Sequence, residues 1–367
     1  MSLVDSAAAS CSECHRYVPT RACVCDIVRY CGATCQKVDW ARHKQDCPPV
    51  VLREVEGKGM GLVTTRRVGA GKVIITECPI IKHLGWTENF HQFLDKFQEL
   101  PVQQKMKYLT LHDPGERSKV VNTEMLEKVM DIGEEAFAIF KVWRILWANG
   151  VYIGMKDGVK EKGVYHTISR INHACRANVV FGLVEPGEDK MTITTCREIS
   201  KNQEILLNYI GAESIFNTQV ERQAELNENW YFDCKCDVCS LTGDQLEQNE
   251  EIRKKVKLCK EQIRSLVKPT LAVTEQAFFL GMEKLEHMEK IKEEVFAAFP
   301  FALMDCYGQA KIIQHFGGKV EIEPELFRDR AAEMSSLLGP STRSVCMEVE
   351  KETDMILARW REGSKKQ

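Results

Sequence analysis

The chain has 367 residues, of which 44% are hydrophobic and 28% charged, and its formal net charge is −3. This length leaves room for two or three domains of ordinary globular composition. Without a positive net charge, the sequence does not predict a dedicated nucleic-acid-binding protein. Residues 1–10 lack the features of a signal peptide, and no apolar run is long enough to span a bilayer. We therefore expect a soluble intracellular protein with no membrane partner.

Residues 11–47 contain seven of the 16 cysteines and are too few to bury a core of their own. A disulfide-linked secreted module is one alternative, but the missing signal peptide and the long cysteine-poor regions favour zinc. With one histidine, the segment has eight ligands, enough for two closed tetrahedral zinc sites of structural type. The predicted ligands are Cys11, Cys14, Cys23, Cys25, Cys31, Cys35, His43 and Cys47.

The next part of the chain alternates between strand and helix signals. Between residues 50 and 82, β-branched runs and glycine-rich turns predict short strands. Residues 83–150 change to helical periodicity, and their aromatic stripes are typical of a core. Strand signals return at residues 164–209, including a strand at 204–209 that ends in a tyrosine. A helical insertion therefore interrupts one β domain, which we place at residues 50–229.

Three further cysteines lie in the segment 230–241, which also contains several aromatic residues. Three thiolates are one ligand short of a structural zinc site, and Cys175 can supply the fourth. Residues 242–367 have helical periodicity, and four prolines divide them into four or five helices. The sequence thus predicts an α+β protein with a helical C-terminal domain and three structural zinc ions, the third bound by Cys175, Cys234, Cys236 and Cys239.

The finger-like segment contains a recognisable set of residues between its ligands. Tyr30-Cys31, Cys35-Gln36, Trp40, His43 and Cys47 resemble the C-terminal half of a MYND zinc finger. The chain departs from that family in its second cysteine pair, where one residue instead of two displaces Cys23. The resemblance implies a protein-interaction module that binds proline-rich peptides. With six Lys or Arg against four Asp or Glu, residues 11–47 favour a peptide over DNA.

Four separated motifs carry a second resemblance. They are Gly57-Lys-Gly-Met-Gly61, Asn172-His-Ala-Cys175, Glu204-Ile-Leu-Leu-Asn-Tyr209 and the segment from Trp230 to Cys239. Each motif alone is weak, but together and in this order they resemble the SET-domain methyltransferases, and specifically the SET-and-MYND lysine methyltransferases. The resemblance covers about residues 11–82 and 140–240. It implies a SET-type fold with a post-SET zinc site.

The resemblance also implies a function and roles for particular residues. The expected reaction transfers a methyl group from S-adenosylmethionine to a lysine of a histone or non-histone protein. Lys58, Gly59 and Met60 are expected to line the methyl donor. Asn172 and His173 are expected to hold its amino-acid end and its adenine, with Phe232 stacked on the adenine. Tyr209 is expected to contact the donor at the point of methyl transfer, as an orienting residue and not a strong base.

Several positions depart from the family pattern. Ala174 and Ala177 replace a serine and a proline, and Met60 replaces a residue that is often arginine or asparagine. Trp230 stands where relatives commonly have a second tyrosine of the lysine channel. Because indole is wider and cannot accept a hydrogen bond, we expect a narrower channel that favours fewer methyl additions or a changed substrate.

A different class of function remains an alternative: a catalytically silent scaffold whose finger and helical domain recruit protein partners. A zinc hydrolase is disfavoured, because every predicted zinc has four protein ligands and no position for an activated water. We expect the protein in the nucleus and the cytoplasm.

Overall fold

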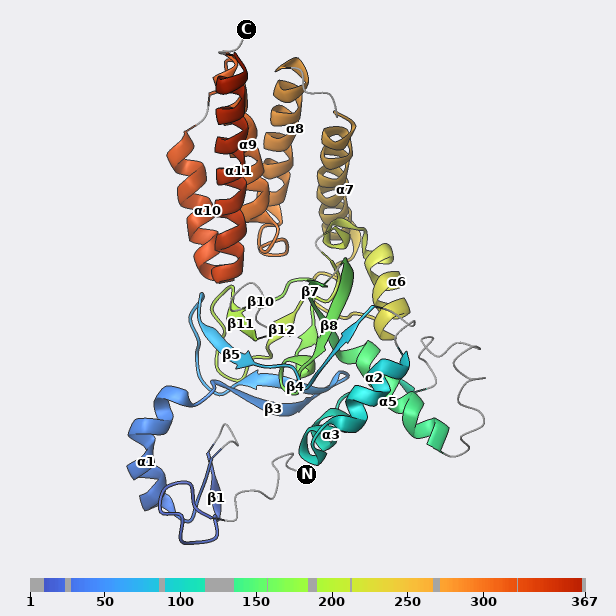
Figure 1. The fold of residues 1–367 in the computed structure, drawn as a ribbon, viewed down its shortest axis with the longest axis vertical. Coiled ribbons are helices and arrows are strands. Elements are labelled where there is room, and N and C mark those ends of the chain that lie inside the picture. The colour runs from blue at the N-terminus through green and yellow to red at the C-terminus, as the bar shows by residue number, and fades with distance from the viewer. Residues whose placement is uncertain are drawn as a thin grey trace.

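The computed structural model has three parts: a small finger, a β-rich middle and a stack of long helices (Figure 1). The finger and the helices lie at opposite ends of the molecule. The structure describes residues 10–23, 28–85, 90–115, 135–156, 158–183, 190–211, 213–266, 271–321 and 323–364.

The finger consists of a two-stranded hairpin and one helix. Strands β1 (Arg21–Ala22) and β2 (Arg29–Tyr30) pair in antiparallel fashion, and α1 (Ala33–Asp46) follows. Tyr30, which is fully buried, donates a hydrogen bond of 2.7 Å to the buried carboxylate of Asp39 on α1. This bond fixes the helix against the hairpin where few apolar side chains are available. The remaining finger core is formed mainly by cysteines.

The middle part contains several small sheets instead of one large one. Strand β3 pairs with β4, β5 with β11 and β11 with β10, while β8 pairs with both β6 and β7. These pairs are all antiparallel, whereas the short strands β9 and β12 pair in parallel. The strands are β3 (Val50–Val55), β4 (Gly59–Thr64), β5 (Val73–Glu77), β6 (Ile81–Leu84), β7 (Gly150–Lys156), β8 (Val159–Val164), β9 (Asn172–His173), β10 (Val179–Leu183), β11 (Met191–Thr195) and β12 (Leu206–Leu207).

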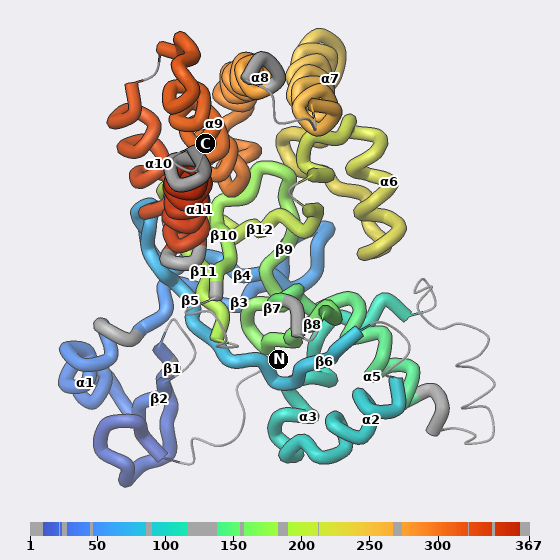
Figure 2. The backbone as a smooth tube through the Cα atoms, turned by 45° about the horizontal axis from the view of Figure 1, so that its top comes forward, coloured from blue at the N-terminus to red at the C-terminus, as the bar shows by residue number. Residues whose placement is uncertain are grey.

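In the described ranges between β6 and β7, the chain forms three helices, which Figure 2 shows on one side of the β-rich part. They are α2 (Phe90–Glu99), α3 (Val102–Leu109) and α5 (Glu135–Asn149). Trp143, at 0% exposure, packs edge-on against Phe90 and Phe93. The aromatic residues of this region are therefore core, as the sequence predicts.

The C-terminal part is helical. Helix α6 (Gln219–Trp230) begins with a capping box, in which Thr218 and Glu221 satisfy each other's backbone amides. Proline occupies the first turn of α9 and of α10, where its missing amide needs no partner. The long helices are α7 (Gly243–Ser265), α8 (Leu271–Lys290), α9 (Phe299–His315), α10 (Pro324–Leu338) and α11 (Pro340–Ser364). None of the helices in the described part of the chain has both the length and the apolar composition needed to cross a bilayer.

The architecture confirms the predicted α+β class and helical C-terminal region, but one strand prediction is wrong. The strand signal at residues 204–209 predicts a six-residue strand, whereas only Leu206 and Leu207 form β12. The reason is a side chain that is distant in sequence. The side chain of Asn178, which is fully buried, bonds both to the amide of Leu206 and to the carbonyl of Glu204, and so replaces part of a strand ladder.

A buried ionic cluster joins the β-rich part to the helices. Arg253 on α7 is fully buried and pairs with Glu294, and its guanidinium also donates to the Ile215 carbonyl. Arg176, which follows β9, reaches the same carboxylate at 3.4 Å. Burial lowers the pKa of Arg253 to about 10, which leaves it charged at neutral pH. The cluster therefore fixes α7 and the segment after α8 against the β-rich part.

We expect Arg253→Met to destabilise the protein by about 3 kcal/mol, because it leaves the buried Glu294 carboxylate with only its longer contacts to Arg176 and Asn249. Chemical denaturation measures this free energy of unfolding. Lys255→Met is the matched control on the same helix, since Lys255 forms a solvent-exposed pair with Glu251 and its loss should leave the free energy of unfolding nearly unchanged. Equal stabilities of the two variants would contradict the role given to Arg253.

Candidate active site

The structure brings the predicted metal ligands together in three groups. Within each group, the ligand atoms lie within 4.8 Å of one another. Sulfur atoms bound to one tetrahedral zinc ion at about 2.3 Å have to be this close, so the groups fit zinc. The groups are Cys11, Cys14, Cys31 and Cys35; Cys23, His43 and Cys47; and Cys175, Cys234, Cys236 and Cys239.

The two finger groups interleave along the sequence, because Cys23 lies between the ligands of the first group and belongs to the second. His43 Nε2 lies 3.2 Å from Cys23 Sγ, and Cys47 Sγ lies 3.9 Å from it. Interleaving ties the hairpin and the helix to each other through two metals. Cys25, the remaining predicted ligand of the finger, lies outside the described residues.

The third group joins two segments that are distant in sequence. Cys175 Sγ lies 3.4 Å from Cys239 Sγ, although 64 residues separate them. The Gln223 side chain on α6 holds the other end, since it accepts from the Cys234 amide at 2.7 Å and donates to the Cys234 carbonyl at 2.6 Å. Buried Arg222 places its guanidinium 3.8 Å from Cys239 Sγ, where its charge offsets that of the thiolates.

This connection determines where the end of α6 lies. Tyr231 takes a left-handed conformation, with φ at 63°, and reverses the chain immediately after Trp230. Phe232 then lies between the end of the helix and the cysteine group. Its ring is 6.4 Å from that of Tyr209 and 6.0 Å from that of His173, between centroids. The aromatic residues of the last motif therefore meet those of two earlier motifs.

Tyr209 is the centre of this aromatic group. Its ring centroid lies 5.5 Å from that of Trp230, and its hydroxyl donates to the Ile171 carbonyl at 2.5 Å. Desolvation by burial raises the pKa of Tyr209 above its usual range. The hydroxyl therefore stays protonated at neutral pH, and it donates its proton in the hydrogen bond to the Ile171 carbonyl. Its oxygen lone pairs remain as acceptors.

The Asn172-His173 pair connects the aromatic group to the glycine turn. His173 is 5% exposed, and its Nδ1 accepts a hydrogen bond of 3.0 Å from the Tyr209 amide. Its Nε2 lies 3.6 Å from Cys175 Sγ, and burial lowers the pKa of the ring to about 4. Both ring nitrogens are thus used inside the protein, so the imidazole itself positions Tyr209. The side chain of Asn172 points the other way, towards Met60, whose carbonyl lies 3.5 Å from Nδ2.

The glycine turn joins β3 to β4. Gly57 and Gly59 have φ values of 71° and 74°, a left-handed conformation that residues with a side chain adopt only with strain. Lys58, Gly59 and Met60 are exposed, so the backbone of the turn is accessible. Gly61 is different: a Cβ there would lie 2.7 Å from Asn172 Nδ2, so only glycine lets the Asn172 side chain approach β4.

Sequence reasoning missed two residues of this site, Asn178 and Glu204. Asn178 fixes the segment before Tyr209, as described above. The Glu204 carboxylate lies 2.7 Å from Lys58 Nζ and 2.8 Å from Asn172 Nδ2. A polar residue at the start of a strand is ordinarily exposed, and only its placement beside Lys58 and Asn172 distinguishes Glu204.

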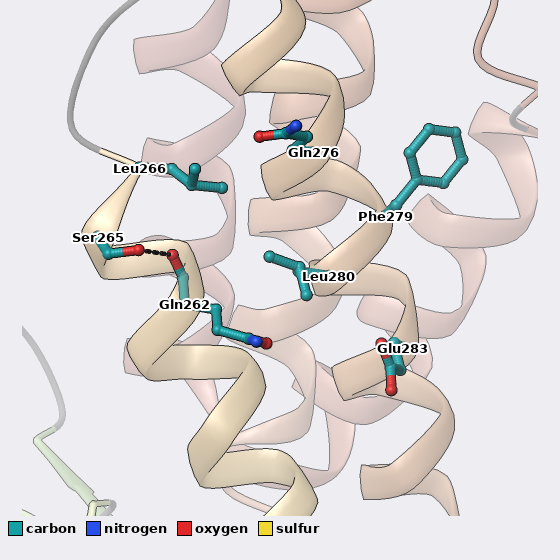
Figure 3. A pocket seen from close by; sticks show the side chains of 7 residues that line it. All are labelled: Gln262, Ser265, Leu266, Gln276, Phe279, Leu280 and Glu283. Carbon is teal, nitrogen blue, oxygen red and sulfur yellow. Dashed lines mark hydrogen bonds between the residues drawn. The ribbon is translucent and has the colours of Figure 1, made fainter.

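A hollow elsewhere in the molecule lacks these features. It lies between the end of α7 and the first half of α8, and its lining residues come only from these two helices (Figure 3). Exposed Phe279 and the partly apolar wall around Leu266 and Leu280 line it. Its lining residues include no metal ligand and none of the predicted donor-binding residues. We therefore place the candidate active site at the four converging motifs.

The arrangement of this site indicates the kind of ligand that it fits. An accessible glycine turn lies beside a Lys–Glu pair, which suits a ligand end that bears both charges. The rings of Tyr209, Trp230 and Phe232 suit an aromatic base and an apolar stem. Within these described residues we find no Ser–His or Cys–His arrangement of nucleophilic type, because the clustered cysteines fit closed metal sites.

The comparison with known families agrees with this geometry. The SET domain family model matches residues 59–210, and the MYND finger model matches residues 11–47. The chain is thus similar to SET domains over one part of its length and to MYND fingers over another. Among its relatives is the histone-lysine N-methyltransferase ASHR1 of Arabidopsis thaliana, which is 25% identical over 65% of this chain and 48% of the relative.

A second relative is the histone-lysine N-methyltransferase SMYD3 of Homo sapiens, at 24% identity over 67% of this chain and 55% of the relative. The chain thus spans about half the length of the curated relatives that it matches. Among solved structures, the SET domain of LSMT bound to lysine and AdoHcy is similar to this chain. The match covers 88% of this chain and 89% of the LSMT chain. It has 11% identity and a TM-score of 0.35, too low to compare the sites.

We expect about three zinc ions per chain, one for each ligand group, measured by elemental mass spectrometry of the purified protein. Cys175→Ser should lower the content to about two, because three remaining ligands hold zinc poorly. Cys78→Ser is the control, since this exposed thiol lies outside the three groups and its loss should leave the content unchanged. Retention of the full zinc content by Cys175→Ser would contradict the assignment of the third group.

Proposed function

We propose that the protein is a protein-lysine methyltransferase that uses S-adenosylmethionine. The observation that carries this proposal is the convergence of the four motifs. Lys58 and Met60 contact the group around Asn172 and Glu204, while His173, Tyr209, Trp230 and Phe232 form one aromatic cluster. The names of the relatives support the same reaction.

The residues fit the donor in separable ways. The accessible turn at Lys58, Gly59 and Met60 would contact its amino-acid end, with Asn172 behind it. The half-buried ring of Phe232 would receive the adenine. When bound, S-adenosylmethionine supplies an already activated methyl group on a positively charged sulfur, so no metal or nucleophilic side chain is needed.

The chain's own residues then have to position and deprotonate a lysine. Alignment of the lysine nitrogen at about 3–3.5 Å from the methyl carbon is a positioning task, which rigid aromatic walls perform well. A lysine has an ordinary pKa of about 10.4, and the apolar surface of Trp230 disfavours its charged form, so that its proton is lost to water before the transfer. The lone pairs of the Tyr209 oxygen, whose proton is held by Ile171, face the polarised groups as acceptors.

The proposal includes a protein substrate, histone or non-histone, in the nucleus or the cytoplasm. It also includes a proline-rich peptide as a partner of the finger. A catalytically silent scaffold is the competing function, and donor binding separates the two, because a scaffold has no need of S-adenosylmethionine.

The direct test is transfer of a labelled methyl group to an array of lysine peptides. We expect the native protein to label a subset of peptides, and Tyr209→Phe to lower the rate about a hundredfold through loss of the oxygen acceptor. Tyr152→Phe is the matched control, because Tyr152 is an exposed tyrosine of β7. No labelling and no calorimetric binding of S-adenosylmethionine by the native protein would support the scaffold instead.

A second prediction concerns the number of methyl groups added. The indole of Trp230 lies against Tyr209. Because indole is wider than a phenol ring, we expect Trp230 to narrow the proposed lysine channel, so that the native enzyme forms mainly monomethyl-lysine. Trp230→Tyr should increase the di- and trimethyl products, measured by mass spectrometry of a labelled peptide. Trp40→Tyr in the finger controls for loss of an indole elsewhere. Equal amounts of the three products from the native enzyme would exclude this role.

A further inference from the structure

Glu204 has no role in the proposed function so far, although it lies at the centre of the polar half of the site. The peptide group between Glu204 and Ile205 is fixed at both of its polar atoms: the Asn178 side chain donates to the Glu204 carbonyl at 2.8 Å, and the Ile205 amide donates to the Leu62 carbonyl of β4 at 2.8 Å. The Glu204 side chain is 14% exposed. The carboxylate is therefore largely enclosed by the site.

The carboxylate has two partners, and each comes from a different predicted donor-binding motif. Oε2 lies 2.7 Å from Lys58 Nζ, and Oε1 lies 2.8 Å from Asn172 Nδ2. The Cβ of a residue at position 61 would lie 2.9 Å from Oε1, so Gly61 leaves the space in which Glu204 and Asn172 meet. Lys58 is the mobile member, since its side chain is 35% exposed on an accessible turn.

The charges of this pair match those of an α-amino acid. A free amino acid carries a carboxylate, which needs donors, and an ammonium group, which needs acceptors. Lys58 offers only donors, and an ionised Glu204 offers only acceptors. In the structure the two side chains satisfy each other, and an amino-acid end placed between them exchanges this one ion pair for two.

We propose that Glu204 and Lys58 form a two-part receptor for the amino-acid end of the methyl donor, in which Glu204 binds the ammonium group and Lys58 the carboxylate. This inference rests on the proposed function, because it assumes that S-adenosylmethionine is the donor. It makes Glu204 a binding residue in its own right. A purely structural Glu204 would only support Asn172.

Three ligands separate these possibilities. S-adenosylmethionine has both charged groups, its decarboxylated form has only the ammonium group, and methylthioadenosine has neither. Dissociation constants are measured by calorimetry on the full chain. Hydrogen bonds to charged groups are strong enough that losing one should raise the dissociation constant about tenfold or more.

Glu204→Gln should weaken both S-adenosylmethionine and its decarboxylated form, and leave methylthioadenosine within about twofold of the native value. Lys58→Met should weaken S-adenosylmethionine without weakening the decarboxylated form. Glu198→Gln is the matched control, a carboxylate that pairs with Arg67 at 2.5 Å on the exposed surface, and it should bind all three as the native protein does. Unchanged binding of methylthioadenosine also shows that each variant is folded.

Two results would overturn the inference while the proposed function stands. In one, Glu204→Gln weakens all three ligands alike, which is the behaviour of a residue that only supports the fold of the site. In the other, the Glu204→Gln variant binds all three ligands as tightly as the native protein does. If the native protein binds none of the three, the proposed function itself fails, and the receptor fails with it.

Discussion

The site depends on one connection, the group of four cysteines formed by Cys175 and the segment from Cys234 to Cys239. Cys175 follows Asn172 and His173 by two or three residues, so the position of this metal group sets the position of both. The other three ligands come after α6 and bring Phe232 and Trp230 against Tyr209. Without this connection, the last aromatic residues would have only the end of a helix to hold them. A structural metal thus assembles a site in whose chemistry it has no part.

Finer contacts divide the assembled site into two halves. Aromatic rings form one half, and His173 links them through its bond to the Tyr209 amide. Lys58, Asn172 and Glu204 form the other, polar half. The two halves meet at the adjacent residues Asn172 and His173, whose side chains point in opposite directions because strand residues alternate. Such a division suits a ligand with a charged end and an aromatic end.

Much of this arrangement could be predicted from the sequence, for physical reasons that differ between residues. Clustered cysteines in a reducing compartment have few uses other than metal binding, so the spacing from Cys234 to Cys239 is informative by itself. The starts of α10 and α11 at Pro324 and Pro340 could be predicted, because proline is favoured in the first turn of a helix and disfavoured further along it. Glu204 could not be recognised, because nothing local distinguishes it from an exposed strand residue. Its role depends on Asn172, which is 32 residues away. The length of the strand at 204–209 could not be predicted for the same reason. The side chain of Asn178, distant in sequence, replaces part of the backbone hydrogen bonds of that strand.

The central claim is that the cysteine group around Cys175 assembles the donor site, and donor affinity after selective loss of one metal tests it most directly. Cys236→Ser removes a ligand of this group, whereas Cys14→Ser removes a ligand of the finger, at the far end of the molecule (Figure 1). Calorimetric titration with S-adenosylmethionine should show binding lost in the first variant and retained in the second. Native affinity in Cys236→Ser, with its zinc demonstrably absent, would contradict the account.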